Sequence, residues 1–134
     1  MDVTSQPDPP QTGIADVDRE HVLELLVVRE IQASLRTGAR ERTLALLERL
    51  TDITEAHFLT ETLLMRQHGF DGYDAHQLEH DRLIGELHAF SRRVADDQVS
   101  DAAAAVQQIE DWLMAHMATE DQVLGAFLQG QQGN

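Results

Sequence analysis

Two pairs of metal-binding residue types, each with members four positions apart, constrain this chain more than any other feature. His57 and Glu61 form one pair in the segment HFLTE, and His76 and His80 form the other in HQLEH. Side chains at positions i and i+4 of an α-helix lie on one face about one turn apart, so each pair can give two ligands to one metal ion. The chain therefore needs a fold in which two successive helices each carry half of a metal site.

The spacing of the apolar residues predicts helices throughout, because these residues recur at three- and four-residue steps. Neither period-two alternation nor bounded clusters of β-branched residues indicates a strand. The expected helices run from about residue 18 to 37, through 47–68, from about 73 to 94 and through 106–127. Gly38 and Gly69 are expected stops, since glycine readily takes the left-handed conformation after a helix. Asp96, Asp97 and Ser100 indicate a connector and an N-cap before the last helix.

Short connectors force each helix back along its predecessor, so the sequence predicts an all-α, antiparallel up-down-up-down four-helix bundle. The length of 134 residues fits one such domain, which we expect to span residues 13–130. Residues 1–12 contain all three prolines among polar residues and are expected to form an irregular, flexible arm.

The expected topology brings further metal-binding residue types to the level of the two pairs. Folding the chain at Gly38, Phe70 and Gln98 aligns candidates at nearly equal distances from each fold point. The aligned pairs are His21 with His57 (17 and 19 residues), Glu61 with His80 (9 and 10), His80 with His116 (18 each) and His76 with Asp121 (22 and 23). Seven candidates therefore fall within a turn or two of one level, a turn being about 5.4 Å.

A single histidine in an apolar stripe is more often a hydrogen-bonded core residue than a metal ligand. Five histidines and two acids at one level favour a metal site, since two buried carboxylates without a neutralising partner would each cost several kcal/mol. The chain has no cysteine, so any metal must be held by histidine and carboxylate groups, and Fe–S clusters and thiol nucleophiles are excluded.

The charge of the chain restricts its partners. It has 24 Asp and Glu residues against 10 Lys and Arg, a formal charge of −14, and such a field repels phosphate backbones and anionic membrane surfaces. No nucleic-acid or membrane partner is therefore expected. The N-terminus lacks the pattern of a signal peptide and no stretch approaches the roughly 20 apolar residues of a membrane span, so a cytoplasmic protein is expected.

Other polar residues are interpreted as structural. His68 lies at an expected helix C-terminus, where its charge suits the helix dipole, and His88 lies about 12 Å along the helix from His80. Five acids are expected on a solvated outer face: Glu24, Glu48, Asp52, Glu110 and Asp111.

One ligand position is ambiguous from geometry. On an ideal helix Glu120 follows His116 by about 40° around the axis, and Asp121 follows it by about 140°. Periodicity alone would therefore select Glu120 as the carboxylate partner.

The segments GIADVDREH, HFLTE, HQLEH and WLMAHMATED, in this order, resemble the ligand pattern of the hemerythrin family, especially that of the single-domain bacteriohemerythrins. The resemblance covers about residues 13–128 and implies a four-helix bundle that binds two irons bridged by a hydroxide or oxo group. The terminal ligands that it implies are His21, His57, His76, His80 and His116, and the bridging ligands are Glu61 and Asp121. The helix must then open near residues 116–121 or swing the Asp121 side chain round, and single π-bulges occur at functional sites.

The family's usual role is reversible dioxygen binding, so the resemblance implies a carrier, storage or delivery protein and not an enzyme. With the bridging group, the iron on three histidines would have six ligands, and the iron on His21 and His57 only five. The open position suits dioxygen, nitric oxide, azide or another small anion. We expect its walls to be apolar side chains beside the ligands or one turn from them: Leu25, Phe58 and Leu113.

Two alternatives share this site. A di-iron sensor of oxygen, nitric oxide or redox state would act through a separate protein partner, which the sequence does not identify. A di-iron peroxidase or oxidase is disfavoured, because paired Glu-x-x-His motifs are absent and no acid or base beyond the ligands is evident in the apolar stripes. The oligomeric state is open, with a monomer as one alternative.

Overall fold

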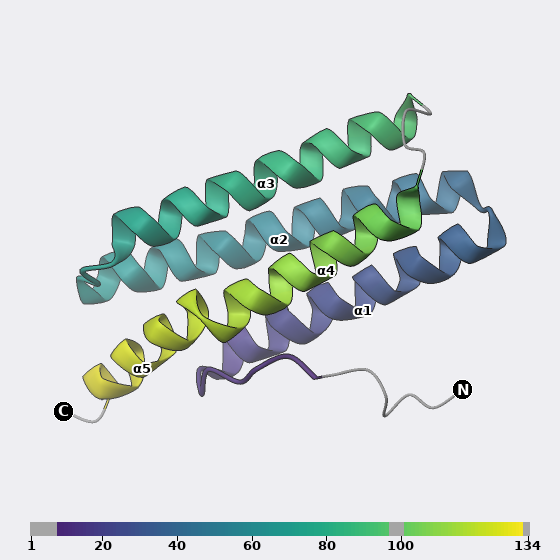
Figure 1. Cartoon of the computed structure of the whole chain (residues 1–134). Coiled ribbons are helices and arrows are strands. Elements are labelled where there is room, and N and C mark those ends of the chain that lie inside the picture. The colour runs from purple at the N-terminus through teal and green to yellow at the C-terminus, as the bar shows by residue number, and fades with distance from the viewer. Residues whose placement is uncertain (1–7, 97–100, 133–134) are drawn as a thin grey trace.

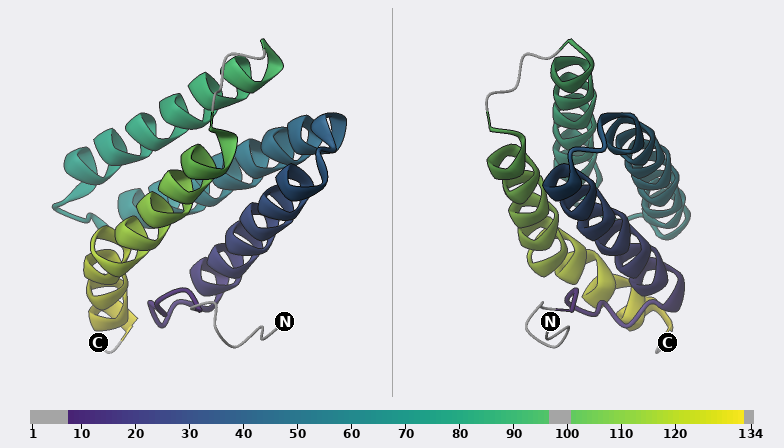
Figure 2. Two further views of the ribbon diagram at one scale, coloured as in Figure 1. Left: turned by 45° about the vertical axis from the view of Figure 1, so that its right-hand side comes forward. Right: turned by 90° about the vertical axis from the view of Figure 1, so that its right-hand side faces the viewer.

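Helices packed side by side make up the regular structure of the chain (Figure 1). The computed structural model describes residues 8–96 and 101–132. In chain order the helices are α1 (Ala15–Thr37), α2 (Arg40–His68), α3 (Tyr73–Ala95), α4 (Ala102–Ala118) and α5 (Glu120–Gln132). Within those ranges no strand occurs, and α1 packs on α2 and α4 while α2 packs on α3 (Figures 1 and 2). The prediction of an all-α, antiparallel four-helix bundle is confirmed.

The two predicted glycine stops end α1 and α2, because both glycines adopt the left-handed conformation. Gly38 has a φ of 71° and Gly69 a φ of 64°. The backbone N–H of Gly38 donates to the carbonyl of Leu35 at 3.3 Å, and that of Gly69 donates to Arg66 at 3.4 Å. Both turns are therefore closed by the last turn of the preceding helix, which fixes where the chain reverses.

The start of α4 is capped by Asp101, whose carboxylate accepts a hydrogen bond from the backbone N–H of Ala104 at 3.0 Å. Asp97 and Ser100, which were expected in the connector and N-cap, lie outside the described residues. The cap places an acid at the helix N-terminus, where it also interacts favourably with the helix dipole.

The end of the N-terminal arm is tied to the bundle by Asp18. One carboxylate oxygen of Asp18 accepts hydrogen bonds from the backbone N–H and the hydroxyl of Thr12, at 2.7 and 2.8 Å, and the other accepts from the N–H of Gly13 at 3.1 Å. The helix accordingly begins at Ala15, three residues before its expected start. Thr12 is buried beside α5, where a Cβ on Gly125 would come within 2.7 Å of the Thr12 carbonyl oxygen. Thr12, the last residue of the arm, is thus packed against α5, although residues 8–12 are not helical.

Two apolar clusters fill the core. The larger is built by α1, α2, α3 and α4 and includes Ile31, Leu47 and Phe90. The smaller is formed by Met65, Leu124 and Leu128, on α2 and α5. The predicted metal ligands lie on the same helices as these apolar residues and interrupt their packing. In the described ranges, no helix is long and apolar enough to cross a membrane.

The last expected helix is divided by Thr119 into α4 and α5. Thr119 has φ −116° and ψ −79°, which departs from regular helical values. Its N–H still donates to the carbonyl of Ala115 at 3.1 Å, but α5 bends away from the direction of α4 (Figures 1 and 2). The prediction of one continuous helix over residues 106–127 is wrong at this position, and the opening takes the form of a break and not a π-bulge.

Candidate metal centre

The seven predicted ligands lie together inside the bundle, and every helix contributes at least one of them. All seven are buried, and the most accessible, His116, is only 3% exposed. Their donor atoms form two groups, each with all atoms within 4.8 Å of one another: His21, His57, Glu61 and Asp121 in one, and Glu61, His76, His80, His116 and Asp121 in the other. We call these the two-histidine position and the three-histidine position. Two adjacent metal positions therefore share both carboxylates.

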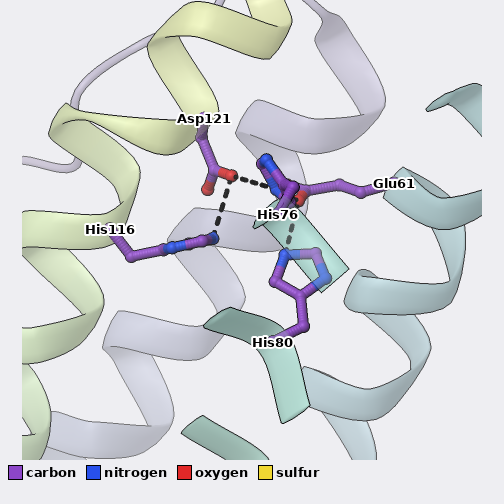
Figure 3. A group of neighbouring side chains, drawn as sticks. All are labelled: Glu61, His76, His80, His116 and Asp121. Carbon is purple, nitrogen blue, oxygen red and sulfur yellow. Dashed lines mark hydrogen bonds and ion pairs between the residues drawn. The ribbon is translucent and has the colours of Figure 1, made fainter. Parts of the chain in front are cut away.

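Glu61 turns one oxygen toward each position. Its Oε2 lies 2.9 Å from Nε2 of His57, whereas its Oε1 lies 2.8 Å from Nε2 of His76 and 3.0 Å from Nε2 of His80. Figure 3 shows the three-histidine position, where the imidazoles of α3 and α4 converge on the carboxylates of Glu61 and Asp121. This division of oxygens is the geometry of a carboxylate that can bridge two metal ions.

Asp121 divides its oxygens in the same way. Its Oδ2 lies 2.9 Å from Nε2 of His21, and its Oδ1 lies 3.1 Å from Nε2 of His116. The break at Thr119 makes this possible, because it restarts the helical register between His116 and the acid. Asp121 is consequently 1% exposed, while Glu120 points to solvent. The structure thus places Asp121, and not Glu120, among the histidines, and Asp121 is the residue that the family resemblance favoured over simple periodicity.

Many polar atoms at this level have no ordinary hydrogen-bond partner. Within the described residues this holds for Oε2 of Glu61, both carboxylate oxygens of Asp121, and Nε2 of His21, His57, His80 and His116. An unsatisfied buried polar group costs about 1–3 kcal/mol, so a group of this size requires a further partner. Imidazole nitrogens and carboxylate oxygens that converge in this way suit divalent transition-metal ions. The residues therefore fit two such ions.

In the metal-free chain, protons supply part of the missing positive charge. Burial lowers the pKa of His21, but its contacts with Asp121 and Glu61 outweigh burial and raise the pKa to about 9. The same opposition raises the pKa of His76 to about 9. Burial by itself would raise the pKa of Glu61, yet the surrounding histidines hold it well below its usual range. Metal binding must therefore displace protons from imidazoles.

The three apolar residues expected around the open position are all buried. Leu25 and Leu113 belong to the larger apolar cluster. The ring of Phe58 stacks on that of His80, with centroids 3.7 Å apart and 2° between the planes, and lies 5.8 Å from the ring of His57. Phe58 thus packs against ligands of both positions and not of the two-histidine position alone.

Glu24 does not lie on the solvated face where it was predicted. It is 1% exposed, its Oε2 accepts a hydrogen bond from the hydroxyl of Thr54 at 2.9 Å, and its Oε1 lies 3.8 Å from Nε2 of His57. Burial raises its pKa above the usual range. The prediction followed the rule that a charged side chain is normally exposed. It is wrong because Thr54 of α2, 30 residues away, donates a hydroxyl hydrogen bond to the buried carboxylate. The expectation of no further acid beside the ligands is wrong for the same reason.

Glu20 is a further site residue that sequence reasoning missed. Its Oε1 lies 2.8 Å from Nδ1 of His57, the ring nitrogen that faces away from the metal position. A carboxylate on that nitrogen fixes the orientation of the imidazole and raises its basicity. The only sequence signal is its place next to His21, since its partner lies 37 residues away.

The remaining polar residues lie apart from the centre. His68 ends α2, and Nε2 of His88 pairs with Glu55 at 3.1 Å on the surface. Three of the other acids assigned to the outer face are exposed: Glu48, Asp52 and Asp111. A groove of about 530 Å³ between α2 and α3 is lined by His88 and by Phe58 and His80, so it reaches the back of the three-histidine position from outside.

A helical bundle with two adjacent metal positions, five imidazoles and two shared carboxylates defines a non-heme dinuclear metal protein. Residues 12–128 match the family model described as the hemerythrin HHE cation binding domain, and the chain belongs to the hemerythrin family. Hemerythrins related to this chain bind a di-iron centre and dioxygen.

Similar proteins agree with this assignment along most of the chain. It is 25% identical to the bacteriohemerythrin of Methylococcus capsulatus over 117 residues, which covers 87% of this chain and 89% of that protein. It is 31% identical to the myohemerythrin of Sipunculus nudus over 77 residues, 58% of each chain. A crystal structure of wild-type hemerythrin superposes with a TM-score of 0.82 and 25% identity, covering 87% of this chain and 90% of that one.

Proposed function

We propose that this chain binds dioxygen reversibly at a di-iron centre, as a carrier or store. The observation that carries the proposal is the inequality of the two positions, in which three histidines on one side and two on the other share the same carboxylates. A small ligand would enter at the two-histidine position, which has fewer imidazoles. The relationship to hemerythrins supports dioxygen as that ligand.

The side chains of the bundle would hold and orient the centre before any ligand enters. The bridging residues would be Glu61 and Asp121, and the terminal ligands would be His21, His57, His76, His80 and His116. When bound, the pair of irons supplies the electrons that reversible dioxygen binding requires. Glu20 orients the imidazole of His57, and Phe58 holds the ring of His80 by stacking.

The apolar packing around the centre supports reversible binding and not turnover. Leu25 and Leu113 are 1% and 2% exposed. They follow His21 and precede His116 by about one turn, so both would exclude water from the two-histidine position. Exclusion of water suppresses the side reactions that would oxidise the irons permanently.

A di-iron peroxidase is the second candidate, because Glu24 places an additional carboxyl group beside the two-histidine position. The two candidates predict different behaviour towards dioxygen. A carrier would return to its reduced form when dioxygen is removed, whereas a peroxidase or oxidase would be left oxidised.

The test uses the full chain loaded with iron and reduced, then taken through repeated cycles of air and vacuum. We expect a visible charge-transfer band that appears in air and disappears under vacuum, with iron content constant through the cycles. Permanent oxidation in the first cycle, with both irons retained, would contradict reversible binding and favour the second candidate.

A further inference from the structure

Glu24 is a buried carboxylate whose two oxygens have different surroundings. Oε2 accepts the hydrogen bond from Thr54, but Oε1 has no hydrogen-bond partner in the described part of the chain. The side chain is 1% exposed, so water cannot easily complete its hydrogen bonding. Thr54 therefore explains one oxygen of Glu24 and leaves the other unexplained.

This oxygen, Oε1 of Glu24, lies on the metal side of His57. It lies 3.8 Å from Nε2, the nitrogen that also meets Glu61, whereas the opposite nitrogen of the ring is occupied by Glu20. Glu24 also follows His21 by three residues on α1, so both side chains occupy the same face of that helix. The place of Glu24 on α1 and its hydrogen bond with Thr54 of α2 thus both direct its side chain toward the two-histidine position.

The separation between Glu24 and His57 is compatible with two ligands on one ion, although Glu24 lies outside the group of four residues whose donor atoms are all within 4.8 Å of one another. Donor atoms about 2.1 Å from one metal ion lie about 3.0 Å apart when adjacent and about 4.2 Å apart when opposite. The 3.8 Å between Oε1 of Glu24 and Nε2 of His57 falls inside this range. It equals the separation between Nε2 of His21 and Oε2 of Glu61, which belong to one ligand group.

The three-histidine position has a neighbouring acid, Glu79, but that acid is already paired. Its Oε1 lies 2.9 Å from the guanidinium of Arg82 on the same helix, and this contact holds the pKa of Glu79 below its usual range. The side chain of Glu79 is also partly exposed to solvent, at 29%. Among the described residues, a buried carboxylate oxygen of Glu24 that lacks a hydrogen-bond partner thus lies beside the two-histidine position.

We propose that Glu24 is a displaceable eighth ligand, which occupies the position on the two-histidine metal ion where small ligands bind. The inference rests on the proposed di-iron centre and adds a residue to it. Bound through Oε1 and held by Thr54 through Oε2, Glu24 completes the coordination of that ion while no other ligand is present. Any small ligand then competes with it, so Glu24 sets the affinity of the centre.

Azide binding to the oxidised, iron-loaded protein tests this competition without involving dioxygen. The exchange breaks one carboxylate–iron bond and forms one azide–iron bond, with no electron transfer. If Glu24 occupies the position about nine-tenths of the time, Glu24→Gln and Glu24→Leu should bind azide roughly tenfold more tightly than the unmodified protein. Thr54→Val keeps the carboxylate but removes its hydrogen bond, so its affinity should lie between these limits.

Glu48→Gln is the matched control, because it removes one negative charge from an exposed site on α2. It should leave azide affinity within the change expected from net charge alone. Iron content is measured on each sample. Unchanged azide affinity in both Glu24 variants, with both irons present, would overturn the proposal while leaving the di-iron centre intact. Loss of one iron from both variants would also overturn it, because a ligand that azide displaces cannot be essential for holding the ion.

Discussion

The two metal positions share the same two carboxylates but differ in their histidines and in the acids beside them. The two-histidine position is built by α1 and α2 and has two further acids beside it, Glu20 and Glu24. The three-histidine position is built by α3 and α4, and the ring of Phe58 stacks on its His80. One side is thus rich in carboxylate and the other in imidazole.

The difference shows that the shared carboxylates do not account for the inequality of the two positions. Glu61 and Asp121 turn one oxygen toward each position, so they are common to both. The helices that supply the histidines make the two positions unequal. A change in the bridge should therefore affect both positions, whereas a change in α1 should affect the two-histidine position first.

The largest expected effect follows from breaking the bridge. Asp121→Ala removes an oxygen ligand from each position, so iron content should fall close to zero. Glu120→Ala is the matched control, since Glu120 is adjacent but exposed, and it should keep full iron. Iron content after gel filtration measures both. Full iron in the Asp121 variant, or loss of iron in the Glu120 variant, would contradict the assignment of the bridge.

The next effect concerns both positions at once. Removing iron leaves five imidazoles and two carboxylates facing one another in the core, so iron-free protein should be less stable. A metal present at about 1,000 times its dissociation constant would stabilise the fold by about 4 kcal/mol. Thermal unfolding with and without iron measures this difference. Equal melting temperatures would show that the two positions are not part of the folded core.

The pH dependence of the stability of the iron-free protein should distinguish the contributions of individual histidines. His21 and His76 have pKa values of about 9, above the ordinary value of 6.5. Their stabilising effect is therefore fully present below about pH 6.5 and is lost as the pH rises through about 9. Urea unfolding at constant salt should show stability falling over this range by a few kcal/mol.

Two variants on α3 make the pH prediction specific. Burial lowers the pKa of His80, so His80 does not lose a proton between pH 6.5 and 9. His76→Ala should consequently weaken the pH dependence, and His80→Ala should leave it in place. The same pH dependence in both variants would contradict the opposed surroundings of these two ligands.

The smallest expected effect concerns the walls of the two-histidine position. Leu113→Ala should speed autoxidation several-fold without loss of iron, because it admits water near that position. Leu47→Ala is the control, since Leu47 is equally buried in the same apolar cluster but lies about 15 Å along α2 from His57. Both changes should destabilise the fold by about 2–5 kcal/mol. Equal autoxidation rates in the two variants would assign the wall to other residues.

The sequence was sufficient where structure depends on local spacing. The i, i+4 pairs and the glycines after α1 and α2 obey rules that act within one helix, so the bundle and the level of the candidate ligands could be predicted. The break at Thr119 could not, because residues 116–121 contain neither Gly nor Pro. The family resemblance, and not helical periodicity, pointed to Asp121.

The burial of Glu24 could not be predicted either, but for a different reason. Its burial depends on a hydroxyl and an imidazole from another helix, 30 and 33 residues away, and nothing in the neighbouring sequence marks either contact. The default expectation that an acid on a helix is solvated is correct for Glu48 and Asp52. Tertiary contacts that override such defaults can be found only once helices are placed side by side.

Anomalous scattering at the iron absorption edge, from a crystal of the iron-loaded protein, tests the central claim most directly. Two adjacent peaks are expected, one beside His21 and His57 and the other beside His76, His80 and His116, with Glu61 and Asp121 in contact with both. A single peak, or two peaks of which one does not touch both carboxylates, would contradict a pair of unequal positions that share one bridge.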